Sequence, residues 1–241
     1  MASVISIVVT VLNEAENIFP VCREIADVLP KLPECEVIFV DDGSTDQTLN
    51  QLIEVKNSFL PSLVILSHSQ RCGKSGALLT AIAAAQGQWI ATMDGDGQDD
   101  PKEIISMWEK SQQHKGREPL VVGVRLKRND NISRRFATTF ANGLRRNLLK
   151  DGCVDTGAPM KLFLRDDFVK LPHFEGLHRF LPALLGHYGV PLVCHEVHHR
   201  QRLNGVSKYT NFNRALVGIR DLLGVIWLLN RIRLPKKITK H

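Results

Sequence analysis

The sequence predicts an α/β fold whose core is a doubly wound, mainly parallel sheet. Two observations lead to this prediction. Short runs rich in β-branched residues alternate with helical stretches through the first half of the chain. Polar clusters follow three of these runs, at the positions where sheets of this kind bind ligands. With 241 residues, the chain is long enough to bury a substantial core.

The elements of this fold are expected in a regular order. Five apolar runs are predicted as buried strands: residues 6–12, 37–40, 63–66, 89–93 and 120–124. Helical patterns lie between them over residues 16–29, 46–58 and 75–86. After Arg125 the pattern changes to a basic helix (132–149), a loop (155–159), a helix (180–188), a strand (191–199) and a helix broken by charges (211–233). We see no repeat or low-complexity linker, so one domain with a C-terminal appendage is the simplest division.

Charge is distributed unevenly along the chain. Residues 1–100 contain 5 Lys/Arg and 14 Asp/Glu, whereas residues 101–241 contain 26 and 11, so that the net charge is +6. The basic second part suits an anionic partner or surface, although a solvated basic face is the alternative. Few aromatic residues accompany these cations, which argues against a nucleic-acid partner. Five cysteines without a CxxC pair, and no signal-peptide pattern, favour the cytosol.

The most informative motif is a pair of carboxylates directly after the run at 89–93. Asp94, Asp96 and Gln98 alternate there with Gly95 and Gly97. Carboxylate and amide oxygens suit Mg²⁺ or Mn²⁺, with phosphate oxygens and water completing the shell. The motif therefore predicts a metal site for a diphosphate-bearing substrate.

Other clusters follow neighbouring strands. Asp41 and Asp42 are placed to hydrogen-bond a ribose or a base, with a capped turn as the alternative. Asn13 and Glu14 follow the first strand and carry a weaker signal. The turn at Lys74 could offer its ammonium and backbone N–H groups to a phosphate, or it is an ordinary helix N-terminus.

The second part of the chain holds candidate anion-binding residues. Arg202 and Lys208 flank a glycine-containing loop and can close on an anion, and Arg125, Arg134 and Arg135 add further cations. The apolar stretch 216–229 is too short to span a bilayer, which needs ~20 apolar residues. With Trp227 and the basic residues that follow, it suits a membrane surface, or else packs on the core or on a dimer partner.

These motifs together resemble family 2 glycosyltransferases. Asn13-Glu14, residues 41–46, Gly73-Lys74, residues 94–98 with Pro101, and residues 202–208 occur in the order of that family. More narrowly the chain resembles the dolichol-phosphate mannosyltransferase-like branch, which moves sugars onto polyprenyl phosphates. The resemblance implies a GT-A fold over residues 1–209, with a nucleotide-sugar half to about 125 and an acceptor half beyond it. Residues 210–241 would form an amphipathic helix and basic tail.

The resemblance also implies roles for individual residues. Asp94, Asp96 and Gln98 would hold the metal. The nucleotide sugar would contact Asn13, Glu14, Asp41, Asp42, Lys74, Asp94 and Gly95. The acceptor phosphate would contact Arg125, Arg134, Ser207 and Lys208. The catalytic group would comprise Asp94, Asp96, Arg202 and Asp155. The chain departs from the family where Ala158-Pro159-Met160-Lys161 replaces a Gly-Phe-Arg-type stretch.

The expected activity is therefore inverting, metal-dependent transfer of a sugar from a GDP-mannose or UDP-hexose type donor to polyprenyl phosphate. It would take place at the cytoplasmic face of a membrane, with a membrane protein or a second copy as possible partners. A transferase acting on a hydroxyl acceptor, with Asp155 as base, is the first alternative. A non-catalytic nucleotide-sugar-binding or membrane-associated subunit is the second.

Overall fold

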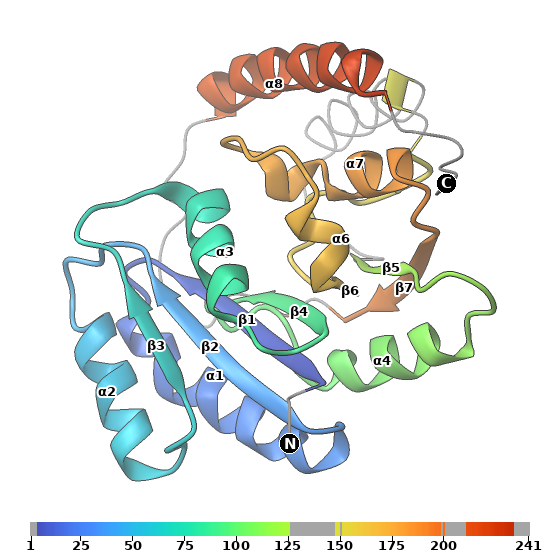
Figure 1. The fold of residues 1–241 in the computed structure, drawn as a ribbon. Coiled ribbons are helices and arrows are strands. Elements are labelled where there is room, and N and C mark those ends of the chain that lie inside the picture. The colour runs from blue at the N-terminus through green and yellow to red at the C-terminus, as the bar shows by residue number, and fades with distance from the viewer. Residues whose placement is uncertain (1–3, 126–147, 150, 199, 201–210, 234–241) are drawn as a thin grey trace, which may run out of the picture.

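The computed structural model describes residues 4–125, 148–149, 151–198, 200 and 211–233. Its centre is a sheet in the order β3-β2-β1-β4-β6-β5-β7 (Figure 1). The strands are β1 Ile5–Val11, β2 Cys35–Asp41, β3 Val64–Ser67, β4 Trp89–Asp94, β5 Leu120–Arg125, β6 Lys161–Leu164 and β7 Leu192–Val197. All pairs are parallel except those of β6, which runs antiparallel to both β4 and β5. The predicted mainly parallel sheet is confirmed.

Helices cover both faces of this sheet (Figure 1). On one face lie α1 Ala15–Val28, α2 Thr48–Ser58 and α4 Glu103–Gln113. On the other lie α3 Gly73–Ala84, α6 Arg165–Val169, α7 Leu181–His187 and, outermost, α8 Asn211–Arg231. Two short 3₁₀ helices, η1 Leu29–Lys31 and η2 Leu177–Arg179, complete the described elements.

Burial on both faces explains why the strands read as continuous apolar runs. In β1, Ile7 and Val9 join the core under α1, whereas Val8 between them joins the core under α3. In β4, Ala91 likewise joins the core under α1, and Ile90 joins the core under α3. Successive side chains of a strand point to opposite faces, so a central strand needs apolar residues at every position.

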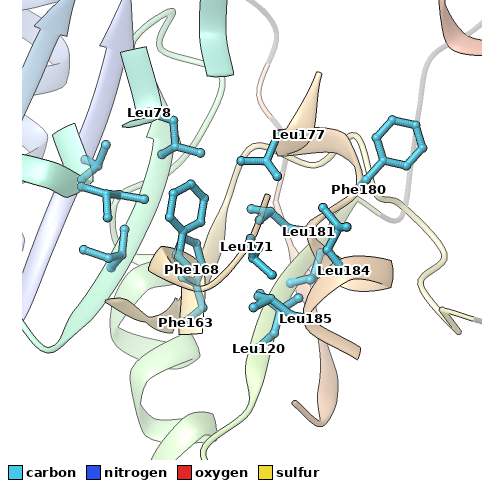
Figure 2. Packing of buried hydrophobic residues seen from close by; sticks show 14 of the residues in the cluster. Leu78, Leu120, Phe163, Phe168, Leu171, Leu177, Phe180, Leu181, Leu184 and Leu185 are labelled. Atoms are coloured by element: carbon cyan, nitrogen blue, oxygen red, sulfur yellow. The ribbon is translucent and has the colours of Figure 1, made fainter. Parts of the chain in front are cut away.

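The core beneath α3 and α7 supports the region where the second half of the chain meets the first. Figure 2 shows Leu78 of α3, Phe163 of β6 and Phe168 of α6 converging with the leucines of α7. The rings of Phe163 and Phe168 stack with their centroids 5.6 Å apart. This packing fixes β6 against its neighbours although the strand has only four residues.

Three elements differ from the sequence prediction. No helix is predicted over residues 103–113 or 165–169 and no strand over residues 161–164, where the structure has α4, α6 and β6. In α4, Ile104, Met107 and Ser111 are buried at the i, i+3, i+7 spacing of one helix face, a pattern that the prediction leaves out. The predicted basic helix at 132–149 lies outside the described residues except for 148 and 149.

Helix α8 packs one side against the core. Val225 is buried, and Leu222 and Leu229 are partly buried against the same cluster as α7. Arg179 of η2 donates to Asp221 at 2.5 Å and ties the helix to the body. The opposite side exposes apolar side chains, including Trp227 at 65%. Within the described residues, no helix combines the length and apolarity needed to cross a bilayer.

Candidate functional site

The loops after β1 and β2 interlock at the carboxyl edge of the sheet. Asn13, in the left-handed region at φ 52°, donates its backbone N–H to Ser44 Oγ at 2.8 Å. Its side-chain oxygen accepts the N–H of Thr45 at 2.7 Å. Glu14 donates its backbone N–H to Thr48 Oγ1 at 2.8 Å and accepts the side-chain N–H of Asn17. These bonds make one platform from two loops that are about thirty residues apart in the sequence.

Asp41 and Asp42 hold the backbone around this platform. Asp41 Oδ1 accepts the N–H of Ser44 at 3.1 Å. Asp42 is buried and accepts the N–H groups of Cys72 and Gly73, each at 2.8 Å, at the beginning of α3. Both aspartates therefore shape the loops, and their contact with a nucleoside stays a prediction.

His68, directly after β3, is a further member of this cluster. Its Nδ1 lies 2.8 Å from Asp42 Oδ1 and its Nε2 lies 2.9 Å from Thr80 Oγ1. Asp42, His68 and Cys72 are close enough to share a metal ion. However, both ring nitrogens and both carboxylate oxygens already form hydrogen bonds, and this bonding accounts for the cluster.

The loop 94–98 begins at the end of β4 and is shaped by its glycines. A Cβ on Gly95 would lie 2.3 Å from Val11 Cγ1, so that only glycine fits there. Asp94 forms an ion pair with Lys74, which stands at the beginning of α3. Asp96 is buried and accepts the N–H of Gln98 at 3.2 Å. The structure thus places Lys74 next to the loop 94–98, which was predicted to bind the metal.

Asp99 is a neighbouring carboxylate that sequence reasoning did not include. It is buried and accepts the backbone N–H of Asp94 at 2.9 Å. Burial, and then the charge of Asp94, raises the pKa of Asp99 to about 7. Such crowding of hard oxygen donors fits a divalent cation, because the ion would relieve the repulsion among Asp94, Asp96 and Asp99.

Gln98 connects this loop to the segment after β7. The backbone N–H of Arg200 donates to Gln98 O at 3.0 Å, and Gln98 Nε2 lies 3.4 Å from Arg200 O. The Arg200 guanidinium binds Glu24 at 2.7 Å and Asp100 at 2.5 Å. From Arg200 the chain continues into the stretch that contains Arg202, Ser207 and Lys208. Those three residues and Arg134 lie outside the described residues.

Two predicted site residues turn out to pair with one another. Arg125, at the end of β5, donates Nε to Asp155 Oδ2 at 2.7 Å and Nη2 to Asp155 Oδ1 at 3.0 Å. Both side chains are nearly buried. A two-point contact of this kind is a strong charge-assisted interaction with a fixed geometry. It engages both oxygens of the carboxylate that the sequence analysis named as a possible base.

A small, partly open pocket lies next to the end of β4, on the α3 side of the sheet. Its polar lining comes from five elements, β1, α3, β4, β6 and η2, which contribute Thr10, Lys74, Thr92, Lys161 and His178. Burial, and then the charge of Lys74, lowers the pKa of Lys161 to about 8. The same two causes lower the pKa of His178 to about 2, so that this ring is neutral. The Arg125–Asp155 pair borders the pocket at Gly157.

The sequence matches the profile described as Glycosyl transferase family 2 over residues 6–171. This match spans more than half of the chain. The chain belongs to glycosyltransferase family 2.

Comparison with individual family members agrees with this assignment. The chain is 34% identical over 230 residues to a protein of Rhizobium johnstonii named dodecaprenyl-phosphate galacturonate synthase, covering 93% of this chain and 67% of the relative. Among solved structures, glucosyl-3-phosphoglycerate synthase of Mycobacterium tuberculosis in complex with UDP matches with a TM-score of 0.69 and 20% identity. That match covers 96% of this chain and 81% of the other. The protein is thus a glycosyltransferase, and the GT-A fold is confirmed.

The same mycobacterial enzyme has also been solved with Mn²⁺, UDP and glucosyl-3-phosphoglycerate, and that structure matches with a TM-score of 0.67 and 21% identity. It covers 96% of this chain and 81% of the other. At this identity the likeness speaks for the fold. In this glycosyltransferase, the loop 94–98 and Lys74 occupy the carboxyl edge of the central strands, where ligands of α/β sheets bind.

Proposed function

We propose that this glycosyltransferase moves a sugar from a nucleoside diphosphate to a polyprenyl phosphate, with inversion at the anomeric carbon. The observation that carries the proposal is the cluster of Asp94, Asp96 and Asp99 beside Lys74 at the carboxyl edge of the sheet. The name of the Rhizobium relative supports the polyprenyl phosphate acceptor. The charge asymmetry of the chain agrees with both substrates.

The donor would bind along the interlocked loops, with its nucleoside near Asn13, Glu14, Asp41 and Asp42. Asp94, Asp96 and Gln98 would hold Mg²⁺ or Mn²⁺, which as a Lewis acid neutralises charge on the leaving diphosphate. Lys74 lies at the same place. On donor binding its ammonium would exchange its contact with Asp94 for a contact with a phosphate oxygen of the donor. Metal and lysine together would stabilise the leaving group.

The acceptor chemistry follows from the charge of a phosphate monoester. Its second pKa near 6 leaves it largely ionised at neutral pH, so that it needs little help from a base. A phosphate oxygen would attack the anomeric carbon in line, while the bond to the diphosphate oxygen breaks and its electrons leave with the nucleotide. Arg125, with Arg134, Arg202, Ser207 and Lys208 from outside the described residues, would position the phosphate.

The Arg125–Asp155 pair favours this acceptor over a hydroxyl group. A hydroxyl acceptor needs a general base, and Asp155 was the candidate for it. Its carboxylate is engaged at both oxygens by Arg125. In this arrangement the N–H groups of Arg125 already occupy both oxygens that a base would offer to a hydroxyl.

Helix α8 would place the enzyme at the cytoplasmic surface of a membrane. Its outer side exposes Val217, Ile219, Leu223 and Trp227, and Arg220 and Arg231 are exposed on the same helix. Apolar side chains framed by cations suit the boundary of anionic lipids. A polyprenyl phosphate is itself held in such a membrane, which favours this occupant over a protein partner or a second copy.

The sugar is less determined than the acceptor. The Rhizobium relative is named for galacturonate, a hexose with a carboxylate at C6, whereas the mycobacterial structures are of a glucosyl transferase. The choice between an acidic and a neutral sugar therefore depends on the pocket of this chain.

The test is transfer of label into lipid. The purified protein is incubated with labelled GDP-mannose and UDP-hexoses, polyprenyl phosphate and Mn²⁺ or Mg²⁺, and the lipid is extracted. We expect metal-dependent label that disappears in Asp94→Ala and Asp96→Ala but persists in Glu109→Ala, which alters an exposed carboxylate of α4. Transfer to a sugar alcohol alone would support the hydroxyl alternative. Donor binding without transfer to any acceptor would support a non-catalytic subunit.

A further inference from the structure

Lys161 is a buried ammonium group with few partners. The residue is 4% exposed, and it stands at the first position of β6, opposite Thr92 of β4. Among the described residues its ammonium has one hydrogen-bond acceptor, the carbonyl oxygen of Ala158. A lysine has three N–H donors, and burying an ammonium is costly unless they are satisfied.

The carboxylates around Lys161 are already paired with other cations. Asp94 forms its ion pair with Lys74, and Asp155 is held at both oxygens by Arg125. Within the described part of the chain, Lys161 itself forms no ion pair. The nearby charge of Lys74 adds repulsion. Among the described residues, the pocket therefore contains a positive group without a dedicated counter-ion.

The pocket places this ammonium next to the predicted diphosphate site. Lys74 and Lys161 both line it, and Thr92 beside Lys161 precedes Asp94 by two residues on the same face of β4. His178 adds a neutral donor: Ser75 Oγ accepts the N–H of Gly176 and lies 2.9 Å from His178 Nδ1. If the hydroxyl donates to Nδ1, the ring proton is on Nε2. Because Lys74 belongs both to this pocket and to the predicted diphosphate site, a group attached to the diphosphate would lie near the pocket.

We propose that Lys161 binds the carboxylate of a hexuronic acid carried by the donor nucleotide. The inference rests on the proposed function and names the class of its sugar. An anionic group supplies what the pocket lacks, and the donor sugar is the part of the substrate that lies beyond the diphosphate. The other source of an anionic oxygen is the acceptor phosphate, and the experiment separates the two.

The experiment compares acidic and neutral donors in binding and in transfer. Affinities for UDP-galacturonate, UDP-glucuronate, UDP-galactose, UDP-glucose and UDP are measured by calorimetry with Mn²⁺ and without acceptor. The variants are Lys161→Met, which keeps the volume without charge, and Lys161→Gln, which keeps a hydrogen-bond donor. Lys110→Met removes a lysine of α4 whose Nζ binds the carbonyl oxygen of Cys194, and serves as the matched control.

We expect the wild-type protein to prefer a hexuronate donor over its neutral counterpart. Lys161→Met should weaken binding of that donor about 10- to 100-fold, the range for a hydrogen-bonded charge, with UDP and neutral donors unchanged. Lys110→Met should change none of them. Because the ammonium is buried with one acceptor, replacing it by an apolar side chain should not lower the melting temperature.

Three results would overturn the proposal. The first is a wild-type protein that prefers neutral donors. The second is an equal loss of affinity for acidic and neutral donors in both Lys161 variants. The third is unchanged donor binding combined with a raised KM for polyprenyl phosphate, which would assign Lys161 to the acceptor. Because binding is measured without acceptor, a failure of lipid transfer would count against the proposed function and not against this inference.

Discussion

At the scale of single residues, charges around the site are matched in pairs. Lys74 stands against Asp94 and Arg125 against Asp155, while Lys161 is unmatched by any carboxylate among the described residues. In a buried setting, removing one partner leaves the other without its bond, which costs more than the pair contributes. The cost of a substitution here therefore depends on whether it leaves a buried polar or charged partner without its hydrogen bond or ion pair.

Asp42→Ala should destabilise the protein strongly. The change removes the acceptor of two backbone N–H groups at the beginning of α3 and the partner of His68. We expect the free energy of unfolding in urea to fall by about 2–3 kcal/mol. Asp27→Ala, at an exposed position of α1, should change it by less than about 0.5 kcal/mol. Equal effects of the two substitutions would show that the Asp42 bonds do not hold the loop.

Binding of a hexuronate donor should weaken as pH rises through about 8. The pKa of Lys161 is lowered to about 8, so the ammonium is charged below that pH and neutral above it, whereas a sugar carboxylate is ionised throughout. The groups that act on it are Lys74, His178, Asp94, Asp155 and Cys153. Bound carboxylate raises the pKa of the ammonium, so kcat should decline at higher pH than kcat/KM.

The measurement is a pH profile of KM for UDP-galacturonate and UDP-galactose side by side. Above pH 8, KM for the acidic donor should rise toward tenfold per pH unit, with no such rise for the neutral donor. Parallel profiles for the two donors would contradict a charged contact from Lys161.

At the scale of elements, the helices on the α3 side of the sheet are arranged in successive layers, with α8 outermost. Helices α3 and α7 line the pocket with Lys74 and Leu181, and α8 packs beyond them through Val225. Figure 1 shows α8 as the outermost helix on this side. The inner side of α8 is occupied by the core, so that only its outer side is exposed. If that side binds a membrane as proposed, a layer of helices separates the membrane from the pocket.

Leu223→Glu and Trp227→Glu should reduce association with anionic phospholipid vesicles. Both side chains are more than 60% exposed, at 62% and 65%, and burying either in a lipid boundary is favourable by about 1.5–3 kcal/mol. We expect vesicle binding in sedimentation to fall at least about tenfold, with the unfolding midpoint unchanged. Asn230→Glu adds the same charge at another exposed position of α8 and should have a smaller effect. If Leu223→Glu and Trp227→Glu bind vesicles as well as the wild-type protein does, the exposed side of α8 has another role.

At the scale of the whole molecule, the parallel sheet collects acidic loops from distant parts of the sequence at one edge. Residues 1–100 carry 14 acidic and 5 basic residues, and Asp94, Asp96 and Asp99 lie together at that edge. Burial, the charge of Asp94 and, more weakly, the charge of Asp96 raise the pKa of Asp99, and a cation bound there would offset this repulsion. Metal binding should therefore be linked to global stability.

Mn²⁺ should raise the melting temperature in the wild-type protein and not in Asp96→Ala. A ligand that binds only the folded state stabilises it by about 2.7 kcal/mol at a hundredfold excess over its Kd. The check is thermal unfolding over a Mn²⁺ titration, with Glu109→Ala as a control that should keep the full shift. Gln98→Leu should require more Mn²⁺ for the same shift, and a wild-type response in that variant would remove Gln98 from the metal shell.

The sequence alone determined the sheet and the positions of its functional loops, because local signals specify both. Strands buried on two faces must be apolar throughout, and the loops that follow β1, β2 and β4 carry their polar residues within a few positions of the strand ends. The order of these motifs also identified the family. Beyond this, β6 has only four residues, too few for a periodic pattern, whereas α4 carries an i, i+3, i+7 pattern that the sequence prediction leaves out.

Only the tertiary structure decided which of those residues act together. Arg125 meets Asp155 thirty positions away, Lys74 meets Asp94, and Arg200 binds the loop of Gln98 across about a hundred positions. Such pairings depend on how the sheet and helices are packed, and residue type does not specify them. The burial of Lys161 arises in the same way, because β6 inserts between β4 and β5 and places an ordinary surface residue type inside a pocket.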